Sequence, residues 1–422
     1  MENGSFAINR SAEETAKQFQ VYLRKHENDD KLVISEVVDK PGSKIGDNYT
    51  SVLIRSKLVG TRGDGSPYAK TFMTKTLSLA RGISNLVDLT DLFRMEAYVY
   101  QKILPTLGPF GPQCIHADEE NIIMEDLAEK GYTNCERRNF LDLDHSVYAL
   151  RKLAKLHASA LAIKIKDPRQ FDKWNNSMTE VFYKDASETS AARMCTEMCT
   201  QLTLKYLEVI EPRTQELQNV IDHISTYNNK TYDTMHRLFN GPKQKYFTIC
   251  HGDPWTNNLL YLHDKNGRIL DLKMVDYQIS RHISVSTDIL YLIYSSVQSS
   301  LIEKSFESLI KIYHNEFIKE LRRCHVNEKI LAEVGTEWLN SELKAFSFYG
   351  AVVGCFLVNP ILAEEEEALQ FESGFGPENP LFTAESVVNP KKLDRIKQIL
   401  LHYYRRFVEN VVRDDLQPIP IT

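Results

Sequence analysis

Residues 245–278 constrain the fold of this chain more than any other segment, because they form a strand-like island within an otherwise helical half. The island has the sequence KYFTICHGDPWTNNLLYLHDKNGRILDLKMVDYQ. Its Asn266-Gly267 pair is typical of the tight turn of a β-hairpin. The returning strand ends at Asp276, so the hairpin would carry this carboxylate back toward the loop 251–258. We therefore expect the polar residues of the loop and Asp276 to meet at one end of the hairpin.

The N-terminal region predicts a small antiparallel sheet followed by one helix. Between residues 31 and 76, three runs rich in Val, Ile, Leu and Thr alternate with turn residues: KLVISEVV, YTSVLIRSKLVGT and YAKTFMTKTL. The Asp64-Gly65 pair indicates a hairpin between the second and third runs. Residues 88–105 follow with helical periodicity, and we expect Pro105 to end that helix.

After a short connector near residue 127, the sequence pattern becomes predominantly helical. Residues 121–127, NIIMEDL, suit a strand that leads into the connector, and four long runs with helical periodicity follow: SVYALRKLAKLHASALAIK, SAARMCTEMCTQLTLKYLEVI, LIEKSFESLIKIYHNEFIKELRR and PKKLDRIKQILLHYYRRFVENVV. A chain of 422 residues is long enough for two lobes. We expect an α+β fold with a small β-rich lobe over residues 1–127 and a larger, mainly helical lobe over 128–422.

Composition bears on the partners and the cellular location of this chain. A net charge of −6 gives no basic footprint, so we expect no nucleic-acid partner. Seven scattered cysteines do not form a disulfide framework, and residues 1–18 contain no apolar stretch resembling a signal peptide, so we expect a cytoplasmic location. Residues 345–363 are uncharged over nearly the length of a membrane span. The Asn359-Pro360 break within them favours a buried core helix over a transmembrane helix.

The loop 251–258, HGDPWTNN, supplies residue types that phosphoryl transfer requires. This reaction needs a positioned base, metal ligands on the phosphates and a cation that contacts them. Asn258 lies five residues after Asp253, which is the interval of the protein-kinase pattern H-R-D-x-x-x-x-N. We predict Asp253 as the catalytic base. Asn258 and Asp276 are the predicted Mg²⁺ ligands, because magnesium prefers a few protein oxygens together with phosphates and water.

Upstream residues complete a predicted nucleotide site. Lys75 lies late in the third strand, where its ammonium would contact the phosphates of ATP, and Glu96 in the following helix would pair with it. The segment KPGSKIGDNYTS between the first two strands contains small residues whose backbone N–H groups can approach phosphate oxygens. From this segment we select Gly46, Asn48 and Ser51 as nucleotide-binding residues. The predicted cofactors are ATP and Mg²⁺.

Three further polar residues have structural interpretations. His157 lies on an apolar helical stripe, so we expect a buried structural histidine. His251 would brace the loop by hydrogen bonding, because Asp253 already supplies a base. Asp288, in STDILYLIY, would either cap a helix or hold the loop, and we favour the cap.

Taken together, the motifs resemble the insect ecdysteroid kinase-like proteins, relatives of the aminoglycoside and choline kinases within the protein-kinase-like fold. The resemblance covers most of the chain and rests on GDNYTS (46–51), TKTL around Lys75, FRMEAYVYQKILP (93–105), MEDL (124–127), LAKLHA (153–158), HGDPWTNN, VDYQ (275–278) and DILYL (288–292). It implies a bilobal fold with adenine against the connector, and hence Glu125 and Leu127 as nucleotide-binding residues. The implied acceptor is a steroid alcohol such as an ecdysteroid, for example at its 22-hydroxyl.

The chain departs from the related patterns at three positions. Tyr277 replaces the commoner Phe, and Thr74 precedes Lys75 where an apolar residue is common. Gln278 replaces the glycine of protein kinases, and only eleven residues separate Asp276 from Asp288, so a protein substrate is disfavoured and no obligate protein partner is expected. Two alternatives stay open. One is a kinase of another small alcohol or xenobiotic, choline-like or aminoglycoside-like, and the other is a non-catalytic nucleotide-binding scaffold.

Overall fold

The computed structural model describes residues 11–42, 51–77, 87–185, 187–364 and 389–410. The first element in this part of the chain is helix α1 (Ala12–Glu27), which we did not predict. A capping box starts it: the Glu14 amide donates to the Ser11 hydroxyl, and the Ser11 amide donates to the Glu14 carboxylate. Phe19 and Leu23 are buried against the neighbouring sheet. The Ser-x-x-Glu pattern before this apolar stripe was the available signal.

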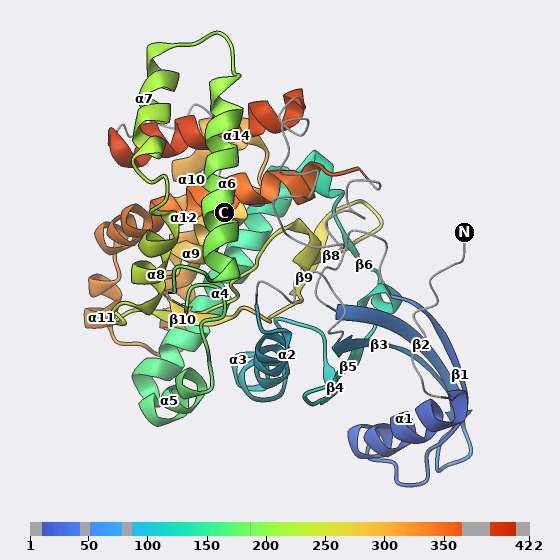
Figure 1. Ribbon diagram of the computed structural model, residues 1–422. Helices are drawn as coiled ribbons and strands as arrows, with labels where there is room; N and C mark the ends of the chain where they lie inside the picture. The colour runs from blue at the N-terminus through green and yellow to red at the C-terminus, as the bar shows by residue number, and fades with distance from the viewer. Residues whose placement is uncertain (1–10, 43–50, 78–86, 186, 365–388, 411–422) are drawn as a thin grey trace, which may run out of the picture.

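The N-terminal sheet is antiparallel and has the strand order β1-β2-β3-β5-β4. Its strands are β1 (Val33–Pro41), β2 (Ser51–Thr61), β3 (Pro67–Leu77), β4 (Cys114–Ala117) and β5 (Asn121–Glu125). Gly65 has a φ of 86° in the turn between β2 and β3, so the predicted hairpin is confirmed. Figure 1 shows this sheet, in blue and teal, together with α1 at one end of the molecule and most of the helices at the other.

The helix after β3 does not end at Pro105 as expected. Helix α2 (Leu89–Tyr98) passes into a π-helical turn (Val99–Ile103) and then into α3 (Leu104–Leu107). The Leu104 amide donates to the Val99 carbonyl across the π turn, and Pro105 then occupies the first turn of α3. A proline is tolerated there because its missing N–H leaves no broken hydrogen bond.

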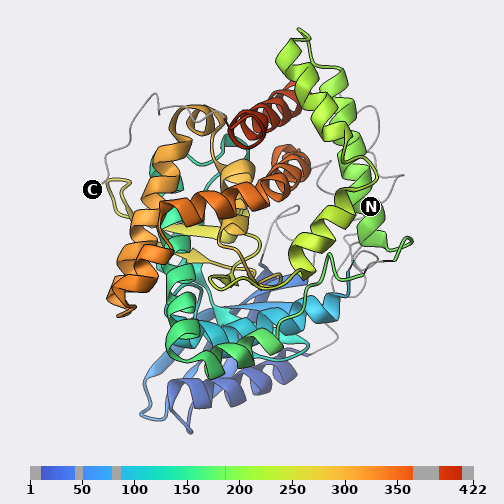
Figure 2. The same ribbon diagram turned by 90° about the vertical axis from the view of Figure 1, so that its left-hand side faces the viewer.

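The helical part contains two small sheets that carry the β island. Strand β7 (Thr248–Cys250) pairs with β10 (Arg281–Ile283), while β8 (Leu259–His263) lies between β6 (Tyr132–Asn134) and β9 (Ile269–Met274). The helices around them are α4 (Leu143–Lys166), α5 (Pro168–Asn176), α6 (Ala191–Glu208), α7 (Gln215–Ser225), α8 (Thr231–Asn240), α9 (Ser286–Ser296), α10 (Ser299–Arg323), α11 (Glu328–Glu333), α12 (Thr336–Leu362) and α14 (Pro390–Tyr403). In the turned view of Figure 2, these helices stand above α1 and the N-terminal sheet. The predicted α+β fold is confirmed.

Helix α12 is the one described helix that is long and apolar enough to cross a membrane, and it packs instead as a core helix. Of its most apolar window, 78% is buried inside the protein, with α9 and α14 among its neighbours. Pro360 does not break this helix, which continues to Leu362. Arg137 donates to the Pro360 and Ala363 carbonyls, which satisfies backbone groups at the helix end.

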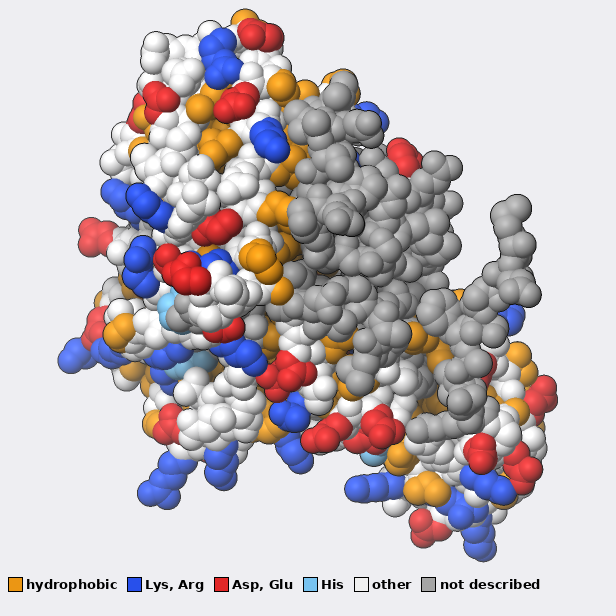
Figure 3. Space-filling model, in the orientation of Figure 1, with side chains coloured by type: hydrophobic (Ala, Val, Ile, Leu, Met, Phe, Trp, Pro, Cys, Tyr) orange, Lys and Arg blue, Asp and Glu red, His pale blue; other side chains and the backbone are white. Residues whose placement is uncertain are grey.

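Charge on the visible face is mixed. Figure 3 shows described Lys and Arg side chains interspersed with Asp and Glu, on both the helical part and the N-terminal sheet. The described part of this face therefore offers no continuous positive field of the kind that a nucleic-acid backbone requires.

Candidate active site

The β8–β9 hairpin returns Asp276 to the loop, as the sequence predicts. Leu259 pairs with Met274, and the Val275 amide donates to the Asn258 carbonyl at 3.1 Å. Because Asp276 follows Val275 directly, it lies at the same end of the hairpin as Asn258. The turn at the opposite end contains Gly267, whose φ is 81°.

Asp276 has an unusual backbone that its side-chain contacts hold in place. Its φ of 67° is in the left-handed region, which residues other than glycine seldom adopt. Its Oδ1 accepts a hydrogen bond from Lys75 Nζ at 2.8 Å, and its Oδ2 accepts one from Gln278 Nε2 at 3.3 Å. Such backbone strain is concentrated at functional sites.

Lys75 lies between two carboxylates. Its Nζ is 2.6 Å from Glu96 Oε2 and 2.8 Å from Asp276 Oδ1, and both Lys75 and Glu96 are buried. Burial alone would lower the pKa of Lys75, but Asp276 and Glu96 outweigh it and raise that pKa above its usual value. Burial also raises the pKa of Glu96. The predicted Lys75–Glu96 pair is confirmed, and the lysine remains a cation.

Asp253 is held at both carboxylate oxygens. The Tyr291 hydroxyl donates to Oδ1, and Asn258 Nδ2 donates to Oδ2 at 2.9 Å. The same Asn258 Nδ2 lies 2.9 Å from the Asp253 carbonyl. Desolvation and the neighbouring Asp276 raise the pKa of Asp253 to about 7, against the opposing effect of these hydrogen bonds. Asp253 is thus a stronger base than an exposed aspartate.

His251 braces the loop, as expected. The Asp253 amide donates to His251 Nδ1 at 3.2 Å, so the proton of the neutral ring resides on Nε2, which donates to the Val275 carbonyl at 3.0 Å. Burial lowers the pKa of His251 and keeps the ring neutral. Gly252 has a φ of 92°, and an added Cβ would lie 2.1 Å from the Ile279 carbonyl oxygen. This turn therefore accepts only glycine.

Asp288 holds the loop, and the helix-cap interpretation that we favoured is wrong. Its carboxylate accepts hydrogen bonds from the backbone amides of His251 (2.7 Å) and Gly252 (2.9 Å). Helix α9 begins at Ser286 with no side-chain cap. The third contact is His157 Nε2 at 3.0 Å, and His157 Nδ1 lies 2.7 Å from the hydroxyl of Tyr313. His157 is the buried structural histidine that we predicted.

The nucleotide-binding candidates outside this cluster are dispersed. Gly46 and Asn48 lie outside the described residues. Ser51 is the buried first residue of β2 and pairs with Leu77. Glu125 ends strand β5 three residues after Ile122, the partner of Lys75, and Leu127 lies beyond the strand, so neither residue pairs with the lysine in the sheet.

The connector that carries Glu125 and Leu127 is held by local contacts. Glu125 Oε1 accepts from the Gln113 amide at 3.0 Å, and the buried Leu127 begins a 3-10 turn. Arg55 pairs with the intervening Asp126 at 2.7 Å. These contacts fix the connector beside the sheet.

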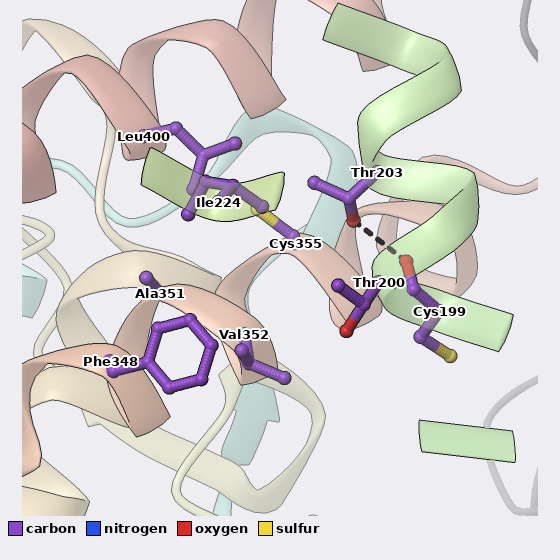
Figure 4. Close-up of a pocket in the computed structure, with 9 residues that line it drawn as sticks. All are labelled: Cys199, Thr200, Thr203, Ile224, Phe348, Ala351, Val352, Cys355 and Leu400. Carbon is purple, nitrogen blue, oxygen red and sulfur yellow. Dashed lines mark hydrogen bonds between the residues drawn. The ribbon is translucent and has the colours of Figure 1, made fainter. Parts of the chain in front are cut away.

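A separate cavity lies between α6, α7, α12 and α14. It encloses about 320 Å³, including open solvent, and Figure 4 shows its lining: Cys199, Thr200, Thr203, Ile224, Phe348, Ala351, Val352, Cys355 and Leu400. None of the candidate site residues contributes to this lining. The cavity is therefore a feature of the helical packing and not the candidate active site.

Tyr291 is the site residue that the sequence analysis missed. It lies three residues after Asp288 in DILYL, so both face the same side of α9. If Asp288 holds the loop, its spacing of three residues from Tyr291 predicts that Tyr291 also faces the loop.

Comparison with known protein families gives a match. The ecdysteroid kinase-like family matches residues 45–326, about two thirds of the chain. No curated protein matches. Among solved structures, the streptomycin–ATP–APH(2″)-IIa ternary complex matches with 11% identity and a TM-score of 0.34, over 85% of this chain and 99% of that chain. That structural likeness is weak, so the assignment of this chain to a family rests on the match over residues 45–326.

Proposed function

Since this chain belongs to the ecdysteroid kinase-like family and is a small-molecule kinase, we propose that it transfers the γ-phosphoryl group of ATP to a steroid alcohol. An ecdysteroid, for example at its 22-hydroxyl, is the proposed acceptor. The proposed lobes are residues 1–127, which bind ATP, and residues 128–422, which carry the catalytic loop and the acceptor site.

One observation carries the proposal: Lys75, Glu96, Asp253, Asn258 and Asp276 converge from distant parts of the chain. Hydrogen bonds join Lys75 to Glu96 and Asp276, and Asn258 to Asp253. A scaffold that only bound a nucleotide would need neither a base nor an amide that orients it. This convergence supports catalysis over the scaffold alternative.

The residues present fit Mg²⁺ and ATP. Asn258 uses its Nδ2 on Asp253, and no donor among the described residues reaches its Oδ1. This oxygen and the Asp276 carboxylate are the hard donors that magnesium prefers. An ammonium has three N–H donors. Lys75 donates two of them to carboxylates, so the third can bind a phosphate oxygen. Bound Mg²⁺ would neutralise charge on the phosphates.

Asp253 would act on the acceptor. Each oxygen of an ionised carboxylate can accept more than one hydrogen bond, so Asp253 can receive the acceptor hydroxyl beside its contacts to Tyr291 and Asn258. Its raised pKa makes it a suitable acceptor of the proton that leaves this hydroxyl. Lys75 would meanwhile hold the phosphates in line.

We also propose that the protein works in the cytoplasm. All seven cysteines lie in the described part of the chain and are free thiols. Free thiols are typical of reducing compartments.

The test is a transfer assay with Mg²⁺-ATP and a panel of ecdysteroids, other sterols, choline and aminoglycosides, in which mass spectrometry detects a phosphorylated product. We expect a phosphorylated ecdysteroid and loss of product in Asp253→Asn. Asp222→Asn is the matched control, because Asp222 is an exposed carboxylate on α7 whose side chain, among the described residues, accepts a hydrogen bond from Gln218 and lies outside the candidate site. Equal transfer by Asp253→Asn would refute the base assignment. Product only with choline or an aminoglycoside would identify another alcohol as the acceptor, and no product with any compound would favour the scaffold.

A further inference from the structure

Besides the contacts of Asp288, helix α9 contacts the catalytic loop through Tyr291, to which the proposed reaction assigns no role. Asp288 holds the backbone of the loop, and one helical turn later the Tyr291 hydroxyl donates to Asp253 Oδ1. Tyr291 is 5% exposed, and every residue of α9 is buried. The position of this hydroxyl is therefore set by a rigid core helix and not by a surface loop.

The surroundings of Tyr291 keep its hydroxyl a donor. Burial and then the Asp253 carboxylate raise the pKa of Tyr291 well above its usual value, so the phenol keeps its proton. The other ionisable groups that act on it are Tyr349 from α12 and Arg281 from β10. The Arg281 guanidinium is itself fixed over the ring of Phe239 at 4.7 Å. When Asp253 is ionised, its carboxylate only accepts, so the Tyr291 hydroxyl is then the donor of this hydrogen bond.

Two donors from different elements determine how the Asp253 carboxylate is turned. Tyr291 binds Oδ1 from α9, and Asn258 binds Oδ2 from the loop. Without the phenol, Asn258 would hold the carboxylate at one oxygen, and the carboxylate could turn about its Cβ–Cγ bond over a wider range. A base must lie within hydrogen-bond reach of the proton that it accepts, so this rotation would reduce the fraction of productive geometry.

We propose that Tyr291 is a positioning residue for phosphoryl transfer: its buried hydroxyl, carried by α9, orients the Asp253 carboxylate toward the acceptor hydroxyl. This inference rests on the proposed function. Tyr291 acts through Asp253 and does not itself receive the proton of the acceptor.

The test compares Tyr291→Phe with Tyr294→Phe. Both changes keep the buried ring and remove one hydroxyl from α9, but the Tyr294 hydroxyl contacts His402 Nδ1 at 2.9 Å, away from the loop. We expect Tyr291→Phe to lower kcat by about 10- to 100-fold, the scale of a misplaced catalytic group. The KM values for ATP and acceptor should stay within about twofold, because no substrate contact is lost. Tyr294→Phe should keep the kcat of the unmodified protein.

Thermal unfolding of both variants separates positioning from a loss of structure. Equal kcat in Tyr291→Phe and the unmodified protein would overturn the inference and leave the proposed function intact. A raised KM for the acceptor with unchanged kcat would also overturn it, since the tyrosine would then bind substrate. An equal fall of kcat and Tm in both variants would mean that α9 is merely destabilised. If the unmodified protein phosphorylates nothing, the proposed function fails, and this inference fails with it.

Discussion

Tyr277 is a buried tyrosine directly after Asp276. Its side chain is 1% exposed, and its hydroxyl has no hydrogen-bond partner among the described residues. The ring packs on His251 with centroids 4.5 Å apart and meets Tyr100 edge-on at 5.5 Å. The ring therefore contributes packing contacts, whereas the hydroxyl is a buried polar group that lowers the stability of the fold.

We predict that Tyr277→Phe raises the free energy of unfolding by about 1 kcal/mol, because it removes an unsatisfied buried hydroxyl. Activity should not change. Tyr313→Phe is the matched control: its hydroxyl lies 2.7 Å from His157 Nδ1, so its loss should lower the free energy of unfolding by about 1 to 3 kcal/mol. Denaturant unfolding measures both values. A destabilised Tyr277→Phe variant would show that the hydroxyl has a partner after all.

Among the elements, helix α9 organises the loop 251–258. Asp288 accepts hydrogen bonds from two successive loop amides and from His157. Burial would raise the pKa of Asp288, but the hydrogen bond from His157 and the charges around it lower that pKa overall. An ionised Asp288 can accept all three bonds at once. A single carboxylate thus fixes the His251–Gly252 part of the loop to the helical core.

The two interpretations of Asp288 make opposite predictions for Asp288→Asn. Asparagine caps helices as well as aspartate does, so a cap would tolerate the change. If Asp288 holds the loop, the change would not be tolerated, because the side-chain N–H₂ of asparagine would face N–H donors of the loop backbone or of His157. We expect Asp288→Asn to lower the free energy of unfolding by about 3 kcal/mol and to lower kcat strongly.

Asp88→Asn is the control for this prediction. Asp88 is an exposed cap of α2 that accepts from the Thr90 amide at 2.9 Å, so the change should cost less than about 0.5 kcal/mol. Thermal or denaturant unfolding and the transfer assay provide the two readouts. Equal tolerance of both substitutions would restore the cap interpretation.

At the scale of the whole molecule, a buried histidine joins separate parts of the helical core. His282 of β10 contacts Asn175 of α5 through Nδ1 at 2.8 Å and the Phe247 carbonyl through Nε2 at 3.1 Å. The ammonium of Lys164 from α4 also lies 3.1 Å from Nε2. Burial, and then this cation, lower the pKa of His282 to about 4.

We predict that the protein loses stability between pH 6.5 and about 4 through His282. In this range the unfolded chain binds a proton, because its histidine has the usual pKa of 6.5, whereas the folded chain does not. The free energy of unfolding therefore falls as the pH falls, and it should fall less steeply in His282→Asn. His325→Asn is the control, because His325 is exposed and asparagine tolerates its left-handed backbone (φ 58°). Identical pH slopes for His282→Asn and the unmodified protein would contradict the prediction.

Much of the fold follows from local sequence, because turn residues and periodicity act over a few neighbours. The pairs Asp64-Gly65 and Asn266-Gly267 occupy tight turns in which glycine has a positive φ, and the strands on either side pair as expected. The same hairpin geometry returned Asp276 to the loop. The start of helix α1 is equally local, because its Ser-x-x-Glu capping box lies within four residues.

What only the tertiary structure decided are the contacts between residues far apart in the chain. No local pattern shows that Pro105 would be accommodated by a π turn, that Asp288 accepts from loop amides 36 and 37 positions earlier, or that Tyr291 reaches Asp253 across 38 positions. Such contacts depend on how α9 packs on the loop, and packing is a property of the assembled core. The sequence by itself indicated Lys75, Glu96, Asp253, Asn258 and Asp276 as candidate site residues, because their types and spacing are local. The tertiary structure decided that these residues meet, that Tyr291 joins them and how each carboxylate is held.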